Sequence, residues 1–146
     1  MNTPSTDDRL AIIDLTIAYC WALDTHDWVG LESVFAPDAT ADLAAPLLHG
    51  VEEIKQRVRR ALDTLDASQH IVANHQVDVD EDGATARCRC YLQAQHVRHN
   101  TAGGDNFLVG GRYWDTIVHG PDGWRIIHRR LEVLWSDGNP AVMEPR

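Results

Sequence analysis

Asp24 is the first candidate for chemistry, because it is a charged residue on a face that its neighbours make apolar. The segment 10–23 is apolar almost all round, as a helix buried in a core is. At helical spacing, Asp24 continues the stripe of Ile13, Ile17 and Cys20. A carboxylate there is costly unless it is paired or hydrogen-bonded. Asp24 therefore either reaches water where the helix ends or meets a cation or an imidazole, and the second case is a candidate active site.

Arg129 is a second charged residue on an apolar face, in the last predicted strand. Alternation places it on the same side as Ile127, Leu131 and Trp135. A guanidinium keeps its proton in proteins, so a buried one needs an anion. The chain thus has a carboxylate on a buried helix and an arginine on a buried strand face. A polar cavity between helix and sheet would accommodate both.

The elements that would position these residues are helices in the first half of the chain and strands in the second. A first helix ends near Asp24, a short second helix covers 28–35, a brief strand covers 40–43, and a third helix covers 51–65. The apolar period then changes from 3.6 to two, which predicts four strands, at 70–79, 84–97, 107–119 and 124–135. Helices followed by antiparallel strands indicate one α+β domain over residues 1–146, with a curved sheet and helices on one side of it.

Composition and charge narrow the functional classes. The formal net charge is -9, with 22 acidic residues against 13 basic ones. This balance argues against nucleic acid or an anionic membrane as a partner, since both attract a basic face. The odd number of cysteines, Cys20, Cys88 and Cys90, is typical of reduced thiols. Because no membrane-spanning run and no signal-peptide pattern is found, we expect a soluble, cytoplasmic protein.

Other chemical patterns are weak. His96 and His99 lie three residues apart, but on a strand that spacing puts them on opposite faces, so no metal site is predicted. The sequence has no phosphate loop, nucleotide fingerprint or Ser-His-Asp signature, and no cofactor is expected. Five tryptophans suit the wall of a pocket for an apolar or aromatic small molecule. The polar loop 99–106 is either a lid or a simple connection.

Three stretches carry a resemblance to a known family: 19–38 (YCWALDTHDWVGLESVFAPD), 70–77 (HIVANHQV) and 111–130 (GRYWDTIVHGPDGWRIIHRR). With the order of elements, they resemble the nuclear transport factor 2-like superfamily and its SnoaL-like group, over residues 8–136. The resemblance implies a cone-shaped barrel, in which three N-terminal helices pack against a curved, mixed or antiparallel sheet around a pocket. It also implies a homo-oligomer, a trimer or dimer, associated through the outer side of the sheet.

Within this superfamily the pattern is nearest to hexachlorocyclohexane dehydrochlorinase, scytalone dehydratase and bile-acid 7α-dehydratase. The resemblance implies a catalytic Asp–His pair, with Asp24 at the end of the first helix and His70 at the start of the strand after the third. Tyr19 and Arg129 match a polar residue and an arginine of the same pattern. The bile-acid enzyme carries an acidic residue in its middle strand where this chain has Gln93 or a neighbour. That departure argues against a steroid-type substrate.

These residues would support proton transfer at carbon. His70 would act as general base, and Asp24 would orient its ring and balance the developing charge. Arg129 would hold a departing hydroxide, halide or enolate oxygen, or neutralise Asp24, and Tyr19 would donate a hydrogen bond to substrate. This favours a cofactor-independent lyase, a dehydratase or dehydrohalogenase, for a small apolar or polycyclic molecule. The alternatives are an isomerase, a polyketide-type cyclase, and a non-catalytic ligand-binding or assembly domain.

Each site residue also has a plain structural interpretation. Asp24 could face solvent at the helix end, and Arg129 could be a counter-ion without a catalytic part. Strict alternation puts His75, not His70, on the apolar face of its strand, so only the family pattern selects His70. Tyr19 could be a core aromatic, because five residues turn a helix by about 140° and carry it away from Asp24.

Overall fold

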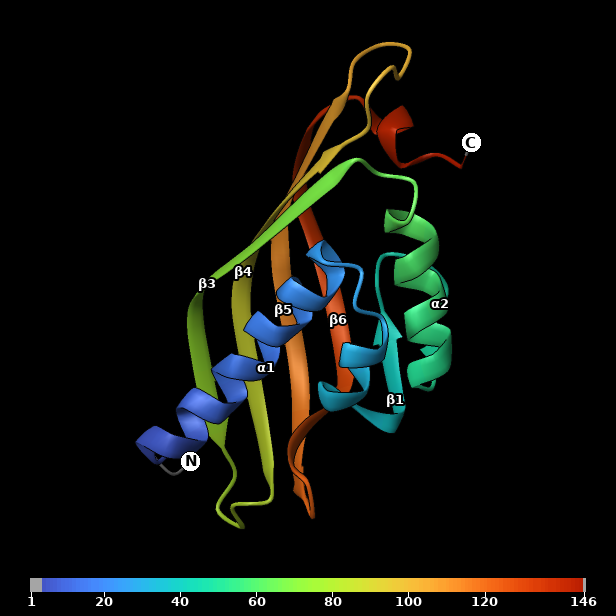
Figure 1. The fold of residues 1–146 in the computed structure, drawn as a ribbon. Coiled ribbons are helices and arrows are strands. Elements are labelled where there is room, and N and C mark those ends of the chain that lie inside the picture. Colours follow the sequence, from blue (N-terminus) through green and yellow to red (C-terminus); the bar gives the residue numbers. More distant parts are fainter. Residues whose placement is uncertain (1–3, 146) are drawn as a thin grey trace.

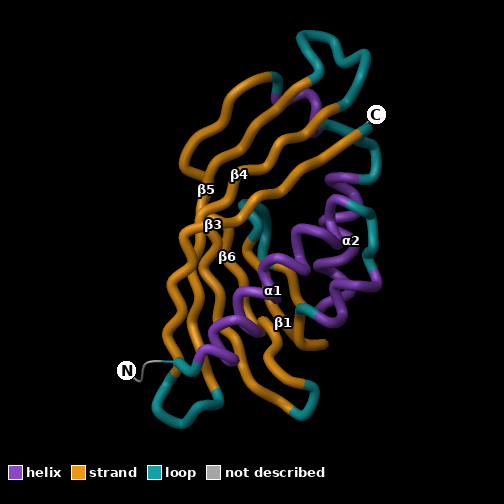
Figure 2. Tube along the Cα trace, turned by 60° about the vertical axis from the view of Figure 1, so that its left-hand side comes forward, coloured by secondary structure: helices purple, strands orange, loops and turns teal. Residues whose placement is uncertain are grey.

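Two α-helices pack on one face of a curved six-stranded sheet in the computed structural model, which describes residues 4–145 (Figures 1 and 2). The helices are α1 (Thr6–Asp24) and α2 (Val51–Leu62), and two short 3-10 turns are η1 (Val29–Ser33) and η2 (Pro140–Met143). The strands are β1 (Phe35–Asp42), β2 (Leu48–His49), β3 (Ala67–Val79), β4 (Thr85–Val97), β5 (Asn106–Gly120) and β6 (Gly123–Gly138).

The sheet has the strand order β2-β1-β6-β5-β4-β3. The long strands β3 to β6 form antiparallel pairs in chain order, as their hairpin turns require. β1 pairs with β6 in parallel, so the sheet is mixed. The predicted α+β class and the four long strands are confirmed.

The short second helix is the part of the helical prediction that is wrong. Residues 29–33 form a single 3-10 turn, and Phe35 already begins β1. Gly30 and the β-branched Val29 and Val34 disfavour an α-helix here, and Pro37 follows too closely for one to continue. The structure therefore has two α-helices where three were expected. It also contains β2, which the sequence pattern did not indicate.

α1 begins where Ser5 caps it, since the Ser5 hydroxyl oxygen accepts a hydrogen bond from the backbone N–H of Asp8. The helix buries Ile12, Leu15, Tyr19 and Leu23 against the sheet, among others. It is not buried all round as predicted, because Leu10, Ile17 and Trp21 are exposed. The buried stripe thus runs beside the predicted one and still brings the helix end, Asp24, to the sheet.

A β-bulge in β3 changes which side chains face the helices. The pairing with β4 shifts register between Ala73 and Gln76, and Asn74 has a positive φ of 59°. Before the bulge the inward side chains are those of Ser68, His70 and Val72; after it they are those of His75, Val77 and Val79. The expected single alternation through this strand is therefore wrong, and His70 and His75 both face inward.

The core lies between the two helices and the inner faces of β4, β5 and β6. All three cysteines are free and buried there, as predicted. Burial raises the pKa of the Cys20 and Cys88 thiols to about 12 and that of Cys90 to about 11. Thiols held protonated in this way are poor nucleophiles, so they serve as core side chains. Within residues 4–145, no helix is long and apolar enough to cross a membrane.

Candidate active site

The site begins where the end of α1 meets the start of β3. The ring Nδ1 of His70 donates a hydrogen bond to Oδ1 of Asp24 over 2.6 Å. The backbone N–H of His70 donates to Oδ2 of the same carboxylate at 2.8 Å, and the hydroxyl of Ser68 donates to Oδ1 at 2.8 Å. The structure therefore brings Asp24 and His70 into direct contact. Ser68, which sequence reasoning missed, lies two residues before His70 on the same strand face.

This geometry keeps Asp24 ionised although it is partly buried. Burial on its own raises the pKa of the Asp24 carboxyl. The hydrogen bonds from the His70 side chain and backbone, the charge of His70 and the hydroxyl of Ser68 outweigh that effect and hold the pKa below its usual value. An ionised carboxylate only accepts hydrogen bonds, so the proton between the two groups lies on Nδ1 of His70, and Nε2 is the ring nitrogen on the other side.

His70 borders two hollows of different character. A groove of about 540 Å³ runs along the end of α1 and the start of β3, with Trp21 and Asp24 among its walls. A smaller pocket of about 130 Å³ lies between the helices and the sheet. His70 lines both, and its side chain is only 6% exposed, against 19% for Asp24.

The interior pocket is the better candidate for the reaction space, despite its smaller volume. Asp24 lines the groove and not the pocket, and it accepts the hydrogen bond from Nδ1 of His70. Nε2 therefore lies on the edge of the His70 ring that points away from Asp24. His96, which lines only the pocket, meets the His70 ring edge to face at 5.8 Å. Within the described chain, no hydrogen bond engages Nε2 of His70. A molecule in this pocket would therefore meet the free nitrogen.

His96 is a functional candidate that sequence reasoning set aside. It is buried, and its Nδ1–H donates to the carbonyl oxygen of Phe107 at 2.9 Å. Burial lowers the pKa of His96, and the hydrogen bond to Phe107 offsets this only in part. The ring is therefore neutral near pH 7 and presents Nε2 as an acceptor. The signal was available, since His96 continues the apolar alternation of Leu92 and Ala94.

Arg129 does not meet Asp24. It is fully buried and forms a two-bond ion pair with Asp115, from Nε to Oδ1 and from Nη2 to Oδ2, each at 2.8 Å. The two residues are direct cross-strand partners on β5 and β6. The third guanidinium nitrogen, Nη1, is buried without a hydrogen-bond partner among residues 4–145. Of the interpretations left open by the sequence, the geometry matches a structural counter-ion, and the anion is Asp115.

Two tyrosines separate this ion pair from the pocket. The guanidinium carbon of Arg129 lies 4.4 Å from the ring centre of Tyr19 and 3.9 Å from that of Tyr113. Burial raises the pKa of Tyr19 to about 12, although the charge of Arg129 acts in the opposite direction. Both tyrosines line the pocket together with His70. Tyr19 is thus a core aromatic with a protonated hydroxyl that lines the interior pocket, and no hydrogen bond joins it to Asp24 in the described chain.

The remaining predicted positions lie outside the pocket. Gln93 is exposed on the outer face of β4, so it cannot stand for an inward acidic residue of the family pattern. His75 faces inward beyond the bulge, where its Nε2 lies 2.8 Å from the hydroxyl of the buried Thr16. No group of three or more potential metal ligands gathers within residues 4–145.

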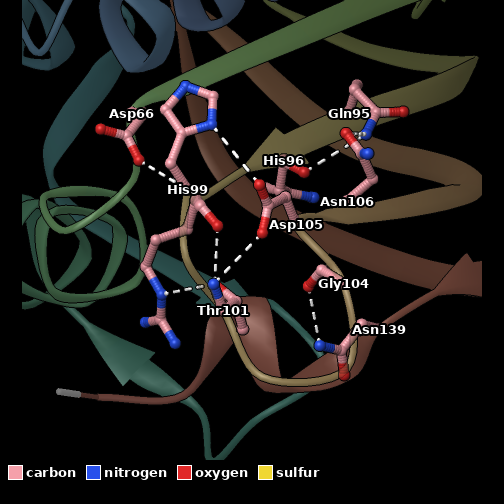
Figure 3. A network of polar contacts seen from close by, with 10 residues as sticks. Asp66, Gln95, His96, His99, Thr101, Gly104, Asp105, Asn106 and Asn139 are labelled. Carbon is pink, nitrogen blue, oxygen red and sulfur yellow. Dashed lines mark hydrogen bonds and ion pairs between the residues drawn. The ribbon is translucent and has the colours of Figure 1, made fainter.

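The loop before β5 is held in place by several hydrogen bonds (Figure 3). The amide nitrogen of Asn139 donates to the carbonyl oxygens of Ala102 and Gly104, and the backbone N–H of Thr101 donates to Asp105. The buried Arg98 donates to backbone carbonyls around η2. This loop therefore fastens the C-terminal turn, whose Met143 lines the pocket.

The fold and the site together define a class. The architecture is that of the nuclear transport factor 2-like fold. A family model described as the SnoaL-like domain matches residues 4–130, and the chain belongs to this family. It is 34% identical over 136 residues to Rv2910c, an uncharacterised protein of Mycobacterium tuberculosis, with 88% of this chain and 87% of the relative covered. The predicted resemblance is confirmed at the level of family and fold.

Solved structures share this fold. A protein of Novosphingobium aromaticivorans, provisionally assigned as an aromatic ring hydroxylase, is similar with a TM-score of 0.85 and 28% identity, over 97% of this chain and 100% of that one. A provisionally assigned scytalone dehydratase of the same organism gives a TM-score of 0.78, 21% identity and 92% coverage of both chains. LinA has a TM-score of 0.78 and 16% sequence identity, over 95% of this chain and 97% of that one.

Proposed function

We propose that the protein is a cofactor-independent lyase that uses the Asp24–His70 pair to remove a proton from carbon. The single observation that carries this proposal is the 2.6 Å contact between Nδ1 of His70 and Asp24, in a histidine that also lines the pocket and whose Nε2 no described residue engages. An imidazole oriented in this way by a carboxylate is a general base suited to neutral pH. Similarity in fold to a provisionally assigned scytalone dehydratase and to LinA supports the same reaction class.

In the proposed reaction, Nε2 of His70 takes a proton from a carbon next to the carbon that bears the leaving group. The electrons of the broken C–H bond form a carbon–carbon double bond, and hydroxide or halide departs with the electron pair of its own bond. Asp24 stabilises the imidazolium that forms. Nε2 of His96 and the hydroxyl of Tyr19 are placed to hydrogen-bond the substrate, one as acceptor and one as donor.

The same residues support an isomerase as the second candidate. If the proton on His70 returns to a different carbon instead of a group being expelled, the outcome is a double-bond shift. Fully buried Arg129, paired with Asp115, has no part in either scheme except to hold Tyr19 and Tyr113 in position. Because the interior pocket measures about 130 Å³, a small substrate is favoured over a polycyclic one.

The test is deuterium exchange and product release over a panel of small alicyclic and aromatic hydroxy and halogenated compounds. In D₂O, substrate should gain deuterium at the acidic carbon or release its leaving group. We expect His70→Ala and Asp24→Asn to lower the rate by about 10²–10⁴-fold, the usual contribution of general base catalysis. His119→Gln, a change at an exposed histidine in the β5–β6 hairpin, is the matched control. Full activity in either site variant would show that this mechanism is wrong.

We also expect a homo-oligomer, a dimer or trimer, as the family resemblance implies. Light scattering after gel filtration measures the mass directly. A monomeric mass at micromolar concentration would contradict this expectation without affecting the proposed chemistry.

A further inference from the structure

Arg57 stands out among the residues that line the interior pocket. The walls are mostly apolar or aromatic, with the two histidines on one side. Arg57, on α2, is the one arginine or lysine among the described lining residues, and it is half-buried. The other half-buried members, Leu43, Leu131 and Met143 among them, come from different segments. Arg57 and these half-buried residues together form the part of the pocket wall that is partly open to solvent.

No described residue pairs with this guanidinium, whereas the nearby Lys55 and Arg129 each have an acidic partner. Lys55 pairs with Glu32 at 3.3 Å and with Glu52 at 2.7 Å. The buried Arg129 has Asp115. Within residues 4–145, no ion pair or hydrogen bond engages the guanidinium of Arg57. A guanidinium keeps its proton, so a permanent positive charge at the edge of an apolar pocket is left without an anion.

We propose that the pocket takes a substrate with one carboxylate, which Arg57 binds while the apolar remainder extends toward His70. That the bound carboxylate is a substrate, rather than only a ligand, depends on the function proposed above. Arginine matches a carboxylate with two parallel hydrogen bonds, which gives orientation as well as affinity. Because Arg57 and His70 come from different walls, the carboxylate and the reacting carbon are at opposite ends of the molecule.

A carboxylate fits the charge of the site better than a phosphate does. One guanidinium neutralises one negative charge, and Asp24 lies behind His70 on the other side. The chain itself has a net charge of -9, so a dianion without a second cation would be repelled. The apolar walls formed by Leu23, Val58 and Leu62 suit a hydrocarbon or aromatic body of small size.

Binding of simple carboxylates tests the proposal without knowledge of the substrate. The probes are isobutyrate, cyclopentanecarboxylate and benzoate, each compared with its neutral amide, and affinity is measured by titration followed by NMR with the full-length protein. We expect at least one acid to bind about tenfold more tightly than its amide, since the amide lacks the charge. Arg57→Gln should weaken that acid about tenfold, and Arg57→Lys should weaken it less. Arg60→Gln, a change at an exposed arginine of the same helix, should leave affinity within about twofold.

Several results would overturn the proposal. The proposal is wrong if the acids and their amides bind equally, or if none of the three acids binds. It is also wrong if Arg57→Gln leaves the affinity unchanged, or if inorganic phosphate at equal concentration displaces the acid that binds most tightly. Unchanged melting temperatures for the variants ensure that a loss of binding reflects the site. His70→Ala should retain acid binding while it loses turnover. Failure of the carboxylate proposal thus leaves the Asp24–His70 mechanism standing, and failure of the mechanism leaves carboxylate binding as a separate result.

Discussion

Asp115 and Asp24 each accept hydrogen bonds from a basic side chain that is largely buried, and the two pairs differ in almost every other physical respect. Asp115 and Arg129 have fully buried side chains and share two bonds across adjacent strands. Asp24 and His70 join a helix end to the edge strand of the sheet, and the carboxylate is 19% exposed. In the first pair the cation cannot lose its proton. In the second pair the basic group is an imidazole, a side chain that can both take up and release a proton.

The difference separates a structural pair from one that we propose to be catalytic. Both oxygens of the Asp115 carboxylate accept hydrogen bonds from Arg129. The rings of Tyr19 and Tyr113 pack against the Arg129 guanidinium. The His70 ring uses Nδ1 for its hydrogen bond to Asp24, and no described residue engages its Nε2. The same side chain lines the pocket. Acid–base work needs a side chain that can exchange a proton and an atom that can reach a ligand, and of these two pairs Asp24–His70 is the one that offers an imidazole at a pocket.

Breaking the buried pair should produce the largest loss of stability. Arg129→Leu leaves the Asp115 carboxylate buried without its cation, which costs about 3–5 kcal/mol. Urea unfolding at pH 7 measures the change. The double variant with Asp115→Leu removes both charges and should recover much of the loss. A loss below about 1 kcal/mol for the single variant would mean that water reaches the pair and that the contrast with Asp24–His70 is wrong.

Asp24→Asn should cost less stability while it removes most of the activity. The lost hydrogen bonds to a charged acceptor are worth about 1–3 kcal/mol at pH 7. The pKa of Asp24 is lowered in the folded state, so this stabilisation is present above the unfolded value of about 3.9 and is lost as pH falls through the lower folded value. Urea unfolding of wild type and variant should therefore differ at pH 7 and converge under strong acid. A constant difference at all pH values would contradict the assignment.

The neutral histidines predict a second, milder pH effect. Burial lowers the pKa of both His75 and His96 in the folded state. The unfolded chain therefore binds more protons just below its own value of about 6.5, and stability falls as pH drops from there toward the folded values. His96→Leu should flatten part of this slope between pH 7 and pH 5 in urea unfolding. An unchanged slope would show that His96 is not held neutral.

The sequence predicted the fold class, the long strands and the position of Asp24 in the candidate site, and the reasons for what it missed are specific. Asp24 was found because a charge on an apolar face is costly. The same pattern marks Asp115, which alternates with Tyr113 and Ile117 and is a second charge on an apolar strand face. His70 came only from family resemblance, because alternation selected His75. The cause is the bulge at Asn74, which no periodicity can show.

That bulge supplies the smallest effect and the most direct test of how the site is positioned. Asn74 adopts a left-handed backbone with φ of 59°, a conformation that asparagine and glycine tolerate and β-branched residues do not. Asn74→Val should cost about 1–2 kcal/mol and also lower activity, because His70 and His75 cannot both face inward without the bulge. Asn74→Gly should keep activity, and Gln69→Val, an exposed change elsewhere in β3, should alter stability by less than about 0.5 kcal/mol. If Asn74→Val unfolds in urea like wild type and remains active, then the packing of α1 against β3, rather than the bulge, directs His70 into the pocket.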